Sequence, residues 1–226
     1  MLVYKTIYQI THIKDPFRAI KLMHTHELLS IYPTLQRKIK QSKDPLYTAL
    51  KLAGISNAID FGANPNFDLQ KELKSMYSRD FDVCEYAEFK KTLQRSKNIL
   101  YIADNAGETV FDRLLIERMK KPTTYAVRSR PIINDATEED AINAGIDTVA
   151  TIISSGCDAP GTILKLCSKK FRKIYQDADM VISKGQGNYE TLSTKRRPIF
   201  FLLKVKCPVI ARDIGIHDGS LVLLKR

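Results

Sequence analysis

The sequence predicts an α/β fold: a Rossmann-like, mainly parallel sheet covered by helices, with an N-terminal all-helical subdomain. From Asn98 onward, short apolar runs alternate with segments of helical periodicity, which is the pattern of a parallel sheet covered on both faces. Before Asn98 the chain shows helical periodicity and helix-start signals. We therefore expect a helical subdomain over residues 1–97 and an α/β core over residues 98–226, joined as one continuous structural unit.

Composition places the chain among globular proteins. Its 226 residues are 44% hydrophobic and include only 10 Gly and 9 Pro, so the chain can bury a sizeable core. No apolar run approaches the length of a membrane span, and the first residues lack the pattern of a signal peptide. The 4 cysteines form no CxxC pair, which argues against a zinc knuckle or a disulfide framework. We expect a cytoplasmic protein with reduced thiols and no membrane partner.

Two helix starts stand out in the helical half. Asp15-Pro16 and Asp44-Pro45 each place Asp at an N-cap and Pro at the first helical position, and apolar residues follow both at helical spacing. Helical patterns also cover Leu69 to Tyr77 and Val83 to Leu93. These patterns predict several helices packed on the sheet.

The segment Gly54 to Asn66 interrupts these helices. It is small and polar, and it is too broken for a regular core helix. We expect it to face the active site with Asn57, Asp60 and Asn64.

Six strands are predicted in the second half, and the chemistry is expected at their shared carboxyl edge. No GxGxxG follows the first of them and no GxxxxGK[ST] occurs, so neither a dinucleotide fingerprint nor a Walker loop is present. The predicted strands are Ile99 to Ala103, Thr123 to Arg128, Thr148 to Ile153, Met180 to Ser183, Ile199 to Val205 and Leu221 to Leu224.

The motif DNAGE follows the first strand and leads into a helix. Asp104, Asn105 and Glu108 therefore crowd one small space at the end of a buried strand. Two carboxylates and an amide suit a hard divalent cation, which prefers oxygen ligands. The structural alternative is a helix N-cap followed by a capping Glu. The residues alone leave both interpretations open.

Three further polar clusters end other predicted strands. In PIINDAT, Thr137 with Asp140 predicts a helix cap and leaves Asp135 as a second metal carboxylate. The stretch 154–161 is small and flexible enough for its amides to approach an anion, or else it is an ordinary turn. In SKGQGNYE, Lys184 precedes a glycine loop and a helix start, a combination that suits phosphate.

The motifs DNAGE, PIINDAT and SKGQGNYE, in that order, resemble the damage-control phosphatase family, formerly a domain of unknown function. The likeness extends to DPFRAIK, DPLYTALKLAG, NAIDFGAN and FFLLKVKCPVIA, and it is nearest to the archaeal-type branch. The resemblance implies a helical subdomain on a Rossmann-like core. It also implies a phosphatase that depends on a divalent metal such as Mn, Ni, Co or Mg and acts on small phosphorylated metabolites, including sugar phosphates and damaged or surplus cofactor intermediates.

Carried over by position, the resemblance implies a metal site and a substrate site. The metal ligands would be Asp104, Asn105 and Asp135. The substrate-binding residues would be Glu108, Lys184, Gly185, Asn188 and Lys206, with Lys206 preferred over Lys204 on the same predicted strand face. Two departures from the family pattern are Ser56, where relatives more often have Gly, and a start inside the usual helical subdomain, without the earlier segment that often bears a cysteine pair.

The expected reaction is phosphomonoester hydrolysis, with either metal-bound water or the carboxylate of Asp104 as nucleophile and Glu108 as general base or hydroxyl ligand. One alternative function is a non-catalytic phosphometabolite or nucleic-acid binding protein. The net charge of +11 raises nucleic acid as a partner, but the basic clusters lie in or beside predicted helices without interleaved aromatic residues. A further alternative, an adenosylmethionine-dependent methyltransferase, lacks the usual glycine-rich loop.

Overall fold

The computed structural model of the protein describes residues 2–57 and 78–226. In this part of the chain seven strands form one sheet in the order β1-β7-β6-β5-β2-β3-β4. Every neighbouring pair is parallel except β6 with β7, so the predicted mainly parallel sheet is confirmed. The strands are β1 (Val83–Cys84), β2 (Ile99–Ile102), β3 (Thr123–Val127), β4 (Thr151–Ser154), β5 (Met180–Lys184), β6 (Phe200–Lys204) and β7 (Leu221–Lys225).

The order of the strands reverses beside β2. The chain runs from β2 to β3 and β4 on one side, and then returns to β5 on the other side of β2. In open parallel sheets, ligands bind at such a reversal, in the crevice outside the carboxyl ends of the strands. The loops after β2 and β5 therefore border the expected site.

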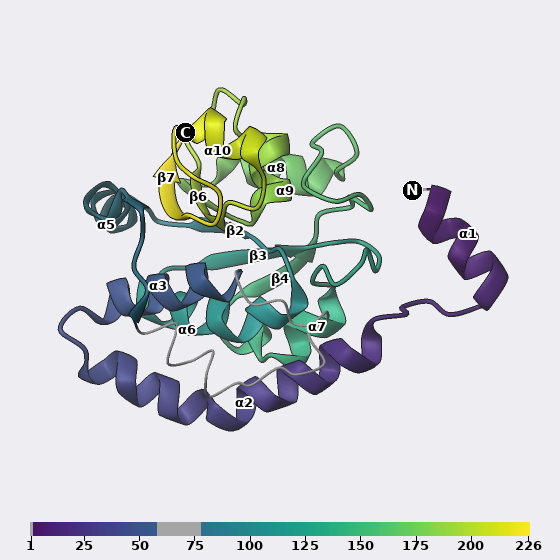
Figure 1. The fold of residues 1–226 in the computed structure, drawn as a ribbon, viewed down its shortest axis with the longest axis horizontal. Coiled ribbons are helices and arrows are strands. Elements are labelled where there is room, and N and C mark those ends of the chain that lie inside the picture. Colours follow the sequence, from purple (N-terminus) through teal and green to yellow (C-terminus); the bar gives the residue numbers. More distant parts are fainter. Residues whose placement is uncertain (1, 58–77) are drawn as a thin grey trace.

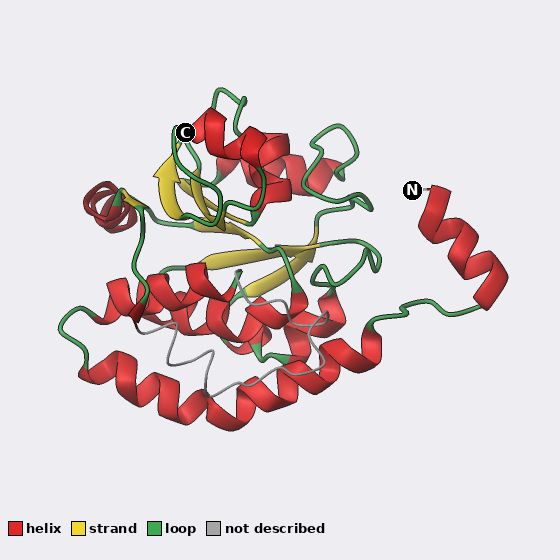
Figure 2. Ribbon diagram, viewed as in Figure 1, coloured by secondary structure: helices red, strands yellow, loops and turns green. Residues whose placement is uncertain are grey.

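Helices cover both faces of the sheet (Figures 1 and 2). The core on one face contains residues of α2, α3, α5, α6 and α7, and the core on the other face contains residues of α8, α9 and α10. The helices are α1 (Leu2–Thr11), α2 (Arg18–Gln41), α3 (Pro45–Ser56), α5 (Tyr86–Arg95), α6 (Thr109–Met119), α7 (Glu138–Asn143), α8 (Lys169–Asp177), α9 (Gln186–Leu192) and α10 (Pro208–Ile214), with 3₁₀ turns η1 (Ala106–Glu108) and η2 (Ile146–Thr148). No helix among the described residues is long and apolar enough to cross a lipid bilayer.

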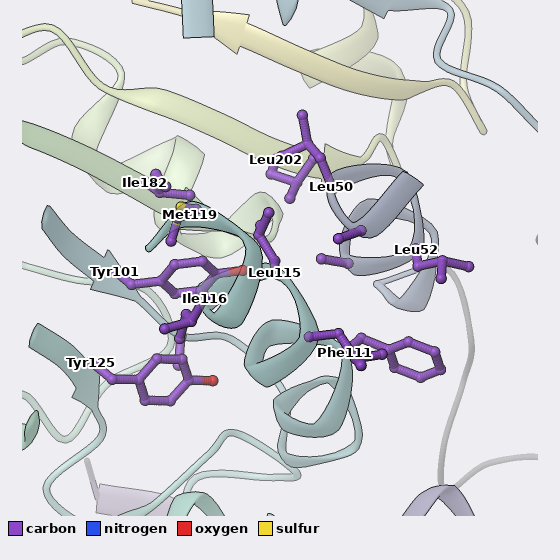
Figure 3. Packing of buried hydrophobic residues seen from close by; sticks show 14 of the residues in the cluster. Leu50, Leu52, Tyr101, Phe111, Leu115, Ile116, Met119, Tyr125, Ile182 and Leu202 are labelled. Carbon is purple, nitrogen blue, oxygen red and sulfur yellow. The ribbon is translucent and has the colours of Figure 1, made fainter. Parts of the chain in front are cut away.

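The central strand β2 is buried on both sides. Ile99 and Tyr101 belong to the core under α6, while Leu100 and Ile102 belong to the opposite core, as alternation along a strand requires. Figure 3 shows Tyr101 beside Tyr125 of β3, with both rings packed against residues of α6. An apolar strand covered on both faces explains why the sequence reads as an unbroken apolar run here.

One predicted helix start is confirmed and the other is wrong. Asp44 caps α3, because its carboxylate accepts from the Tyr47 amide at 3.1 Å and Pro45 is the first helical residue. At Asp15-Pro16 the predicted helix start is wrong, because α2 begins only at Arg18. The Asp15 carboxylate there accepts from the Phe17 amide in a turn and pairs with a lysine of α2 instead of capping it.

Two predicted elements begin at other residues. The predicted helix Val83 to Leu93 is wrong at its start, because Val83–Cys84 pairs with β7 as an edge strand and α5 begins only at Tyr86. The sheet thus includes a strand that precedes residue 98. The strand predicted over Thr148 to Ile153 is β4, which begins only at Thr151, because Thr148 belongs to the 3₁₀ turn η2.

The segment Gly54 to Asn66 is more regular at its start than predicted, because α3 continues through Ser56. The predicted helix Leu69 to Tyr77, together with Asp60 and Asn64, lies outside the described residues.

Candidate active site at the carboxyl edge of the sheet

The segments that follow β2 and β3 are joined by their backbones. The amide of Ala136 donates to the carbonyl of Asp104 at 2.7 Å, and Asn105 and Asp135 face each other in an antiparallel bridge. Just before them Ile133 has φ 47°, a left-handed conformation that is rare for a β-branched residue. The bridge brings the three predicted metal ligands together.

Asp104 is held between amide groups and a glycine. Its Oδ2 accepts from Nδ2 of Asn57 at 2.9 Å and from Nδ2 of Asn105 at 3.2 Å. On the β5 side, a Cβ placed on Gly185 would lie 1.9 Å from this same oxygen, and φ of Gly185 is +78°. Gly185 therefore lies directly beside Asp104, and both the space and the backbone conformation require glycine.

Negative charge accumulates around Asp104. Burial and the neighbouring carboxylates of Glu108 and Asp135 raise the pKa of Asp104 to about 8, while Arg128 and Lys206 oppose this increase. A carboxyl group with so high a pKa holds a proton near neutrality unless a cation replaces it. The site is therefore short of positive charge.

Asn105 and Glu108 both cap a turn and line the site. They form a capping box at η1, so the structural alternative is confirmed. Glu108 is 1% exposed, and its Oε1 accepts from Nδ2 of Asn57 at 2.7 Å and from Nδ2 of Asn105 at 2.8 Å. Since a carboxylate only accepts hydrogen bonds, both amides must turn their nitrogens toward it. The Oδ1 of Asn57 accepts from the backbone amide of Lys204 at 3.1 Å.

Lys184 lies beneath the site rather than at its surface. It is fully buried, and Nζ contacts Oε2 of Glu108 at 2.5 Å and Oδ1 of Asp112 at 2.8 Å. The hydroxyls of Tyr101 and Tyr125 donate to the two oxygens of Asp112 at 2.6 and 2.7 Å. In this structure both carboxylates hold the ammonium group of Lys184, and its predicted contact with a phosphate stays a prediction.

Arg128 anchors the other predicted metal carboxylate. It is 4% exposed, and its Nε donates to Oδ2 of Asp135 at 2.6 Å. Its Nη1 donates to Thr162 at 3.0 Å and its Nη2 to Oδ1 of Asn188 at 3.1 Å. Burial raises the pKa of Asp135, and Arg128 works against this increase.

Asn188 ties the two central strands together. It is fully buried, and its Nδ2 donates to the carbonyl of Ala103 at 3.0 Å and to that of Lys184 at 2.8 Å. Its Oδ1 accepts from Thr162 at 2.8 Å. The structure therefore places this predicted substrate ligand behind the site, where it holds the ends of β2 and β5 in register.

Lys206 is the exposed cation of the predicted set. It lies just beyond β6, its backbone amide donates to Gln186 at 2.7 Å, and its charge acts on Asp104. In the stretch 154–161 the amides of Gly156 and Cys157 donate to the hydroxyls of Ser154 and Ser155, as in a turn, and the predicted approach of an anion stays a prediction.

Sequence reasoning missed Arg128 and Asp112. Asp112 lies among apolar residues of α6 and four positions after Glu108, and a carboxylate on an apolar helix face is a detectable signal of a buried pair. Arg128 directly follows β3 and gave no comparable signal, because arginine at a strand end is usually exposed.

The charges of the site do not balance. Asp104, Glu108, Asp112 and Asp135 bring four carboxyl groups, against the two cations Lys184 and Arg128. Within residues 2–57 and 78–226, no group of three or more His, Cys, Asp or Glu side chains has the geometry of a metal centre. A cation here would therefore need another donor, such as the amide oxygen of Asn105.

A Rossmann-like sheet with an acidic, oxygen-rich site at its strand-order reversal defines a class of α/β proteins that bind ligands at the carboxyl edge. The chain belongs to the damage-control phosphatase family, because the family model of the damage-control phosphatase ARMT1-like domain matches residues 1–222. This confirms the family resemblance that the sequence motifs indicate, and it supports a phosphatase role in metabolite repair.

Relatives agree with this assignment. A damage-control phosphatase of Pyrococcus horikoshii is 38% identical over 99% of this chain and 79% of its own length. A damage-control phosphatase of Archaeoglobus fulgidus is 33% identical over 97% of this chain and 79% of its own length. The crystal structure of a DUF89 family protein from Pyrococcus horikoshii superposes with a TM-score of 0.89 at 37% identity, covering 99% of this chain and 80% of that one.

Proposed function

We propose that the protein is a divalent-metal-dependent phosphatase that hydrolyses phosphomonoesters of small metabolites, such as sugar phosphates or damaged or surplus phosphorylated cofactor intermediates. The observation that carries the proposal is the unbalanced charge at the carboxyl edge of the sheet. Four carboxyl groups face two buried cations there, and one carboxyl has its pKa raised to about 8. A divalent cation such as Mn, Ni, Co or Mg would balance the remaining two charges.

The donor set fits such a cation. Within the described part of the chain, hydrogen bonds engage Oδ2 of Asp104 and Oδ2 of Asp135, so Oδ1 of each carboxylate remains for a ligand. Nδ2 of Asn105 donates to the carboxylates of Asp104 and Glu108, so the carbonyl oxygen is the atom of this amide that can act as a ligand. Carboxylate and amide oxygens are ligands that hard divalent cations accept.

In the proposed reaction the bound cation would supply charge stabilisation to a phosphate oxygen. The exposed ammonium of Lys206 binds a second phosphate oxygen. Gly185 leaves room for the Asp104 carboxylate itself, because a side chain there would occupy the position of that carboxylate. The nucleophile is either water or the Asp104 carboxylate, and a phosphoenzyme on Asp104 would distinguish the second route.

A cleft beside the site suits a small organic group. It has a volume of about 290 Å³ and is lined by residues that include Arg79, Lys204 and His217. Lys204 also connects it to the site, because its backbone amide donates to Asn57, which in turn contacts Asp104. We propose that the leaving group of the ester lies in this cleft, and its mixed charges favour a polar metabolite.

A panel of phosphate esters assayed with several divalent metals tests the proposal. We expect metal-dependent release of phosphate, and loss of activity and of metal binding in Asp104→Ala and in Asp135→Ala, with the fold retained. Asp177→Ala is the control, because this exposed carboxylate of α8 pairs with Lys173 on the surface of the helix. Phosphate-ester binding without metal and without turnover would favour the non-catalytic binder, and adenosylmethionine binding by calorimetry would favour the methyltransferase.

A further inference from the structure

We infer that Asp112 is a positioning residue, which acts through Lys184 and Glu108 to fix the Asn105 amide at the candidate cation site. This inference rests on the proposed function in so far as Asn105 is taken as a metal ligand. Nothing in the reaction requires Asp112 to touch substrate, since it lies in α6 and is fully buried beneath Lys184. Its contribution therefore has to pass through the side chains that it holds.

The first step is the anchoring of Asp112 itself. Its Oδ1 accepts from the Tyr101 hydroxyl at 2.6 Å and its Oδ2 from the Tyr125 hydroxyl at 2.7 Å. Figure 3 shows the two rings side by side with their hydroxyl oxygens pointing the same way, and the ring centroids are 5.4 Å apart. The two tyrosines come from neighbouring strands β2 and β3, so the carboxylate of Asp112 is fixed relative to the sheet.

The second step is the placement of the Lys184 ammonium. Asp112 Oδ1 holds Nζ at 2.8 Å, and Nζ in turn donates to Oε2 of Glu108 at 2.5 Å. A lysine side chain has a long, flexible stem, and a buried ammonium is stable only with partners of opposite charge. Asp112 therefore keeps Lys184 charged and directed at Glu108.

The third step leads from Glu108 to Asn105. With Oε2 held by Lys184, Oε1 of Glu108 accepts from Nδ2 of both Asn105 (2.8 Å) and Asn57 (2.7 Å). Because the carboxylate of Glu108 can only accept, Nδ2 of Asn105 is fixed on this side, which leaves the carbonyl oxygen as the atom of this amide that can act as a ligand. With the backbone amide of Asn105 also donating to Oε1, Glu108 has four donors and serves orientation rather than proton transfer.

The free-energy cost of burying charges favours a functional reason for this series of contacts among Asp112, Lys184 and Glu108. Buried ion pairs often cost more free energy in lost solvation than they return, so well-packed apolar residues of similar size are frequently as stable or more stable. Asp112 and Lys184 are both fully buried, together with their partners Glu108, Tyr101 and Tyr125. Outer residues that orient metal ligands typically change metal affinity by 10- to 100-fold when removed.

The test is a double-mutant cycle on the full chain, with Mn²⁺ as the probe. We expect Asp112→Asn to lower Mn²⁺ affinity, measured by calorimetry, by about tenfold or more. If Asp112 acts through Lys184, the same change made in a Lys184→Met background should have almost no further effect. Asp140→Asn is the matched control, because it breaks the buried pair of Lys21 and Asp140, also 2.8 Å, and should reduce stability without reducing affinity.

A second readout does not depend on metal. In the metal-free protein, exchange of the Asn105 side-chain amide protons, followed by nuclear magnetic resonance, should speed up about tenfold in Asp112→Asn. Should that variant not fold, Asp112→Leu combined with Lys184→Met replaces the pair by apolar residues and carries the same expectations.

Unchanged exchange in the folded variant would overturn the inference, whether or not the protein binds metal. Additive effects on Mn²⁺ affinity in the cycle would also overturn it. A wild-type protein that binds no divalent cation would instead refute the proposed function, while the exchange measurement would still decide whether Asp112 positions Asn105.

Discussion

Gly185 lies so close to Asp104 that a single methyl group would occupy the space of the carboxylate. Its φ of +78° also disfavours any side chain. We expect Gly185→Ala to destabilise the protein by about 1–3 kcal/mol. Because Asp104 would have to move, we also expect phosphatase activity to fall by about a hundredfold. Chemical denaturation and turnover of a phosphate ester measure the two effects.

The control for this substitution is Gly215, which ends α10. Its φ of +84° is similar, but a Cβ there would meet nothing within 4 Å. Gly215→Ala should therefore lose stability through backbone strain alone and keep its activity. Equal activity of the two variants would show that the contact of Gly185 with Asp104 has no role in the reaction.

The raised pKa of Asp104 makes the stability of the metal-free protein depend on pH. The folded state holds this proton up to about pH 8, whereas the ordinary value of an aspartate is 3.8. Since the folded state binds more protons in that range, the contribution of Asp104 to the free energy of unfolding falls as pH rises from about 4 to about 8. For one proton the slope reaches about 1.4 kcal/mol per pH unit.

Denaturation of the metal-stripped protein between about pH 5 and about pH 9, which spans the folded-state pKa of about 8, would measure the effect. Other groups titrate as well, so the informative quantity is the difference between wild type and Asp104→Asn. We expect the variant to lose less stability toward high pH. Parallel pH profiles for the two proteins would contradict the prediction.

At the scale of elements, the cap of α3 connects helix stability to the site. Asp44 accepts from the Tyr47 amide and from the Tyr86 hydroxyl, and α3 ends directly before Asn57. Asp44→Ala should lower the free energy of unfolding by about 1 kcal/mol. Asp44→Asn retains a capping acceptor and should be nearly neutral. If both variants were equally destabilised in denaturant titrations, the charge of Asp44 rather than its capping hydrogen bond would account for its contribution to stability.

The short strand β1 illustrates how elements depend on their neighbours. Val83 and Cys84 continue an apparently helical pattern, yet they pair with Val222 and Leu223 of β7. Two residues cannot show a strand periodicity of their own, so only the exposed edge of β7 decides their conformation. Similarly, β4 begins later than predicted because α7 ends at Asn143 and the left-handed Gly145 leads into the 3₁₀ turn η2.

At the scale of the whole molecule, the net charge of +11 need not serve binding. The basic residues of α8, such as Lys169, Lys170 and Lys173, are exposed on a helix that covers the sheet face opposite α6. Lys206, in contrast, follows β6 at the carboxyl edge and acts on Asp104. These positions separate a general basic surface from a local phosphate contact.

The salt dependence of binding distinguishes a general basic surface from a local phosphate contact. A diffuse attraction to polyanions weakens steeply with salt because many counterions are released, whereas one phosphate held by a cation and a lysine should weaken little. We expect a shallow change in KM for a sugar phosphate between low and physiological salt, with weak and salt-sensitive binding of duplex DNA. Lys206→Ala should raise KM, and Lys170→Ala should not. Tight, sequence-selective DNA binding at physiological salt would overturn this expectation.

The sequence by itself determined those features that depend on residues near one another along the chain. Alternating strand and helix patterns predicted the mainly parallel sheet and its chemically active edge, because periodicity follows from local backbone geometry. Asp44-Pro45 predicted a helix start, and Thr137 with Asp140 predicted the cap of α7. Asp104 and Asp135 were found because they directly follow their strands, and the backbone bridge does bring them together.

Only the tertiary structure decided the partners of the charged groups. The sequence predicts Lys184 and Asn188 as substrate ligands. In the structure, Lys184 is held by two carboxylates that lie 76 and 72 residues away along the chain. Asn188 contacts Arg128, which lies 60 residues away. Whether a lysine at a strand end points to solvent or into the core depends on which groups the other strands and helices place beneath it. A buried charge must find a partner, and such partners are set by packing across the sheet rather than by spacing along the chain.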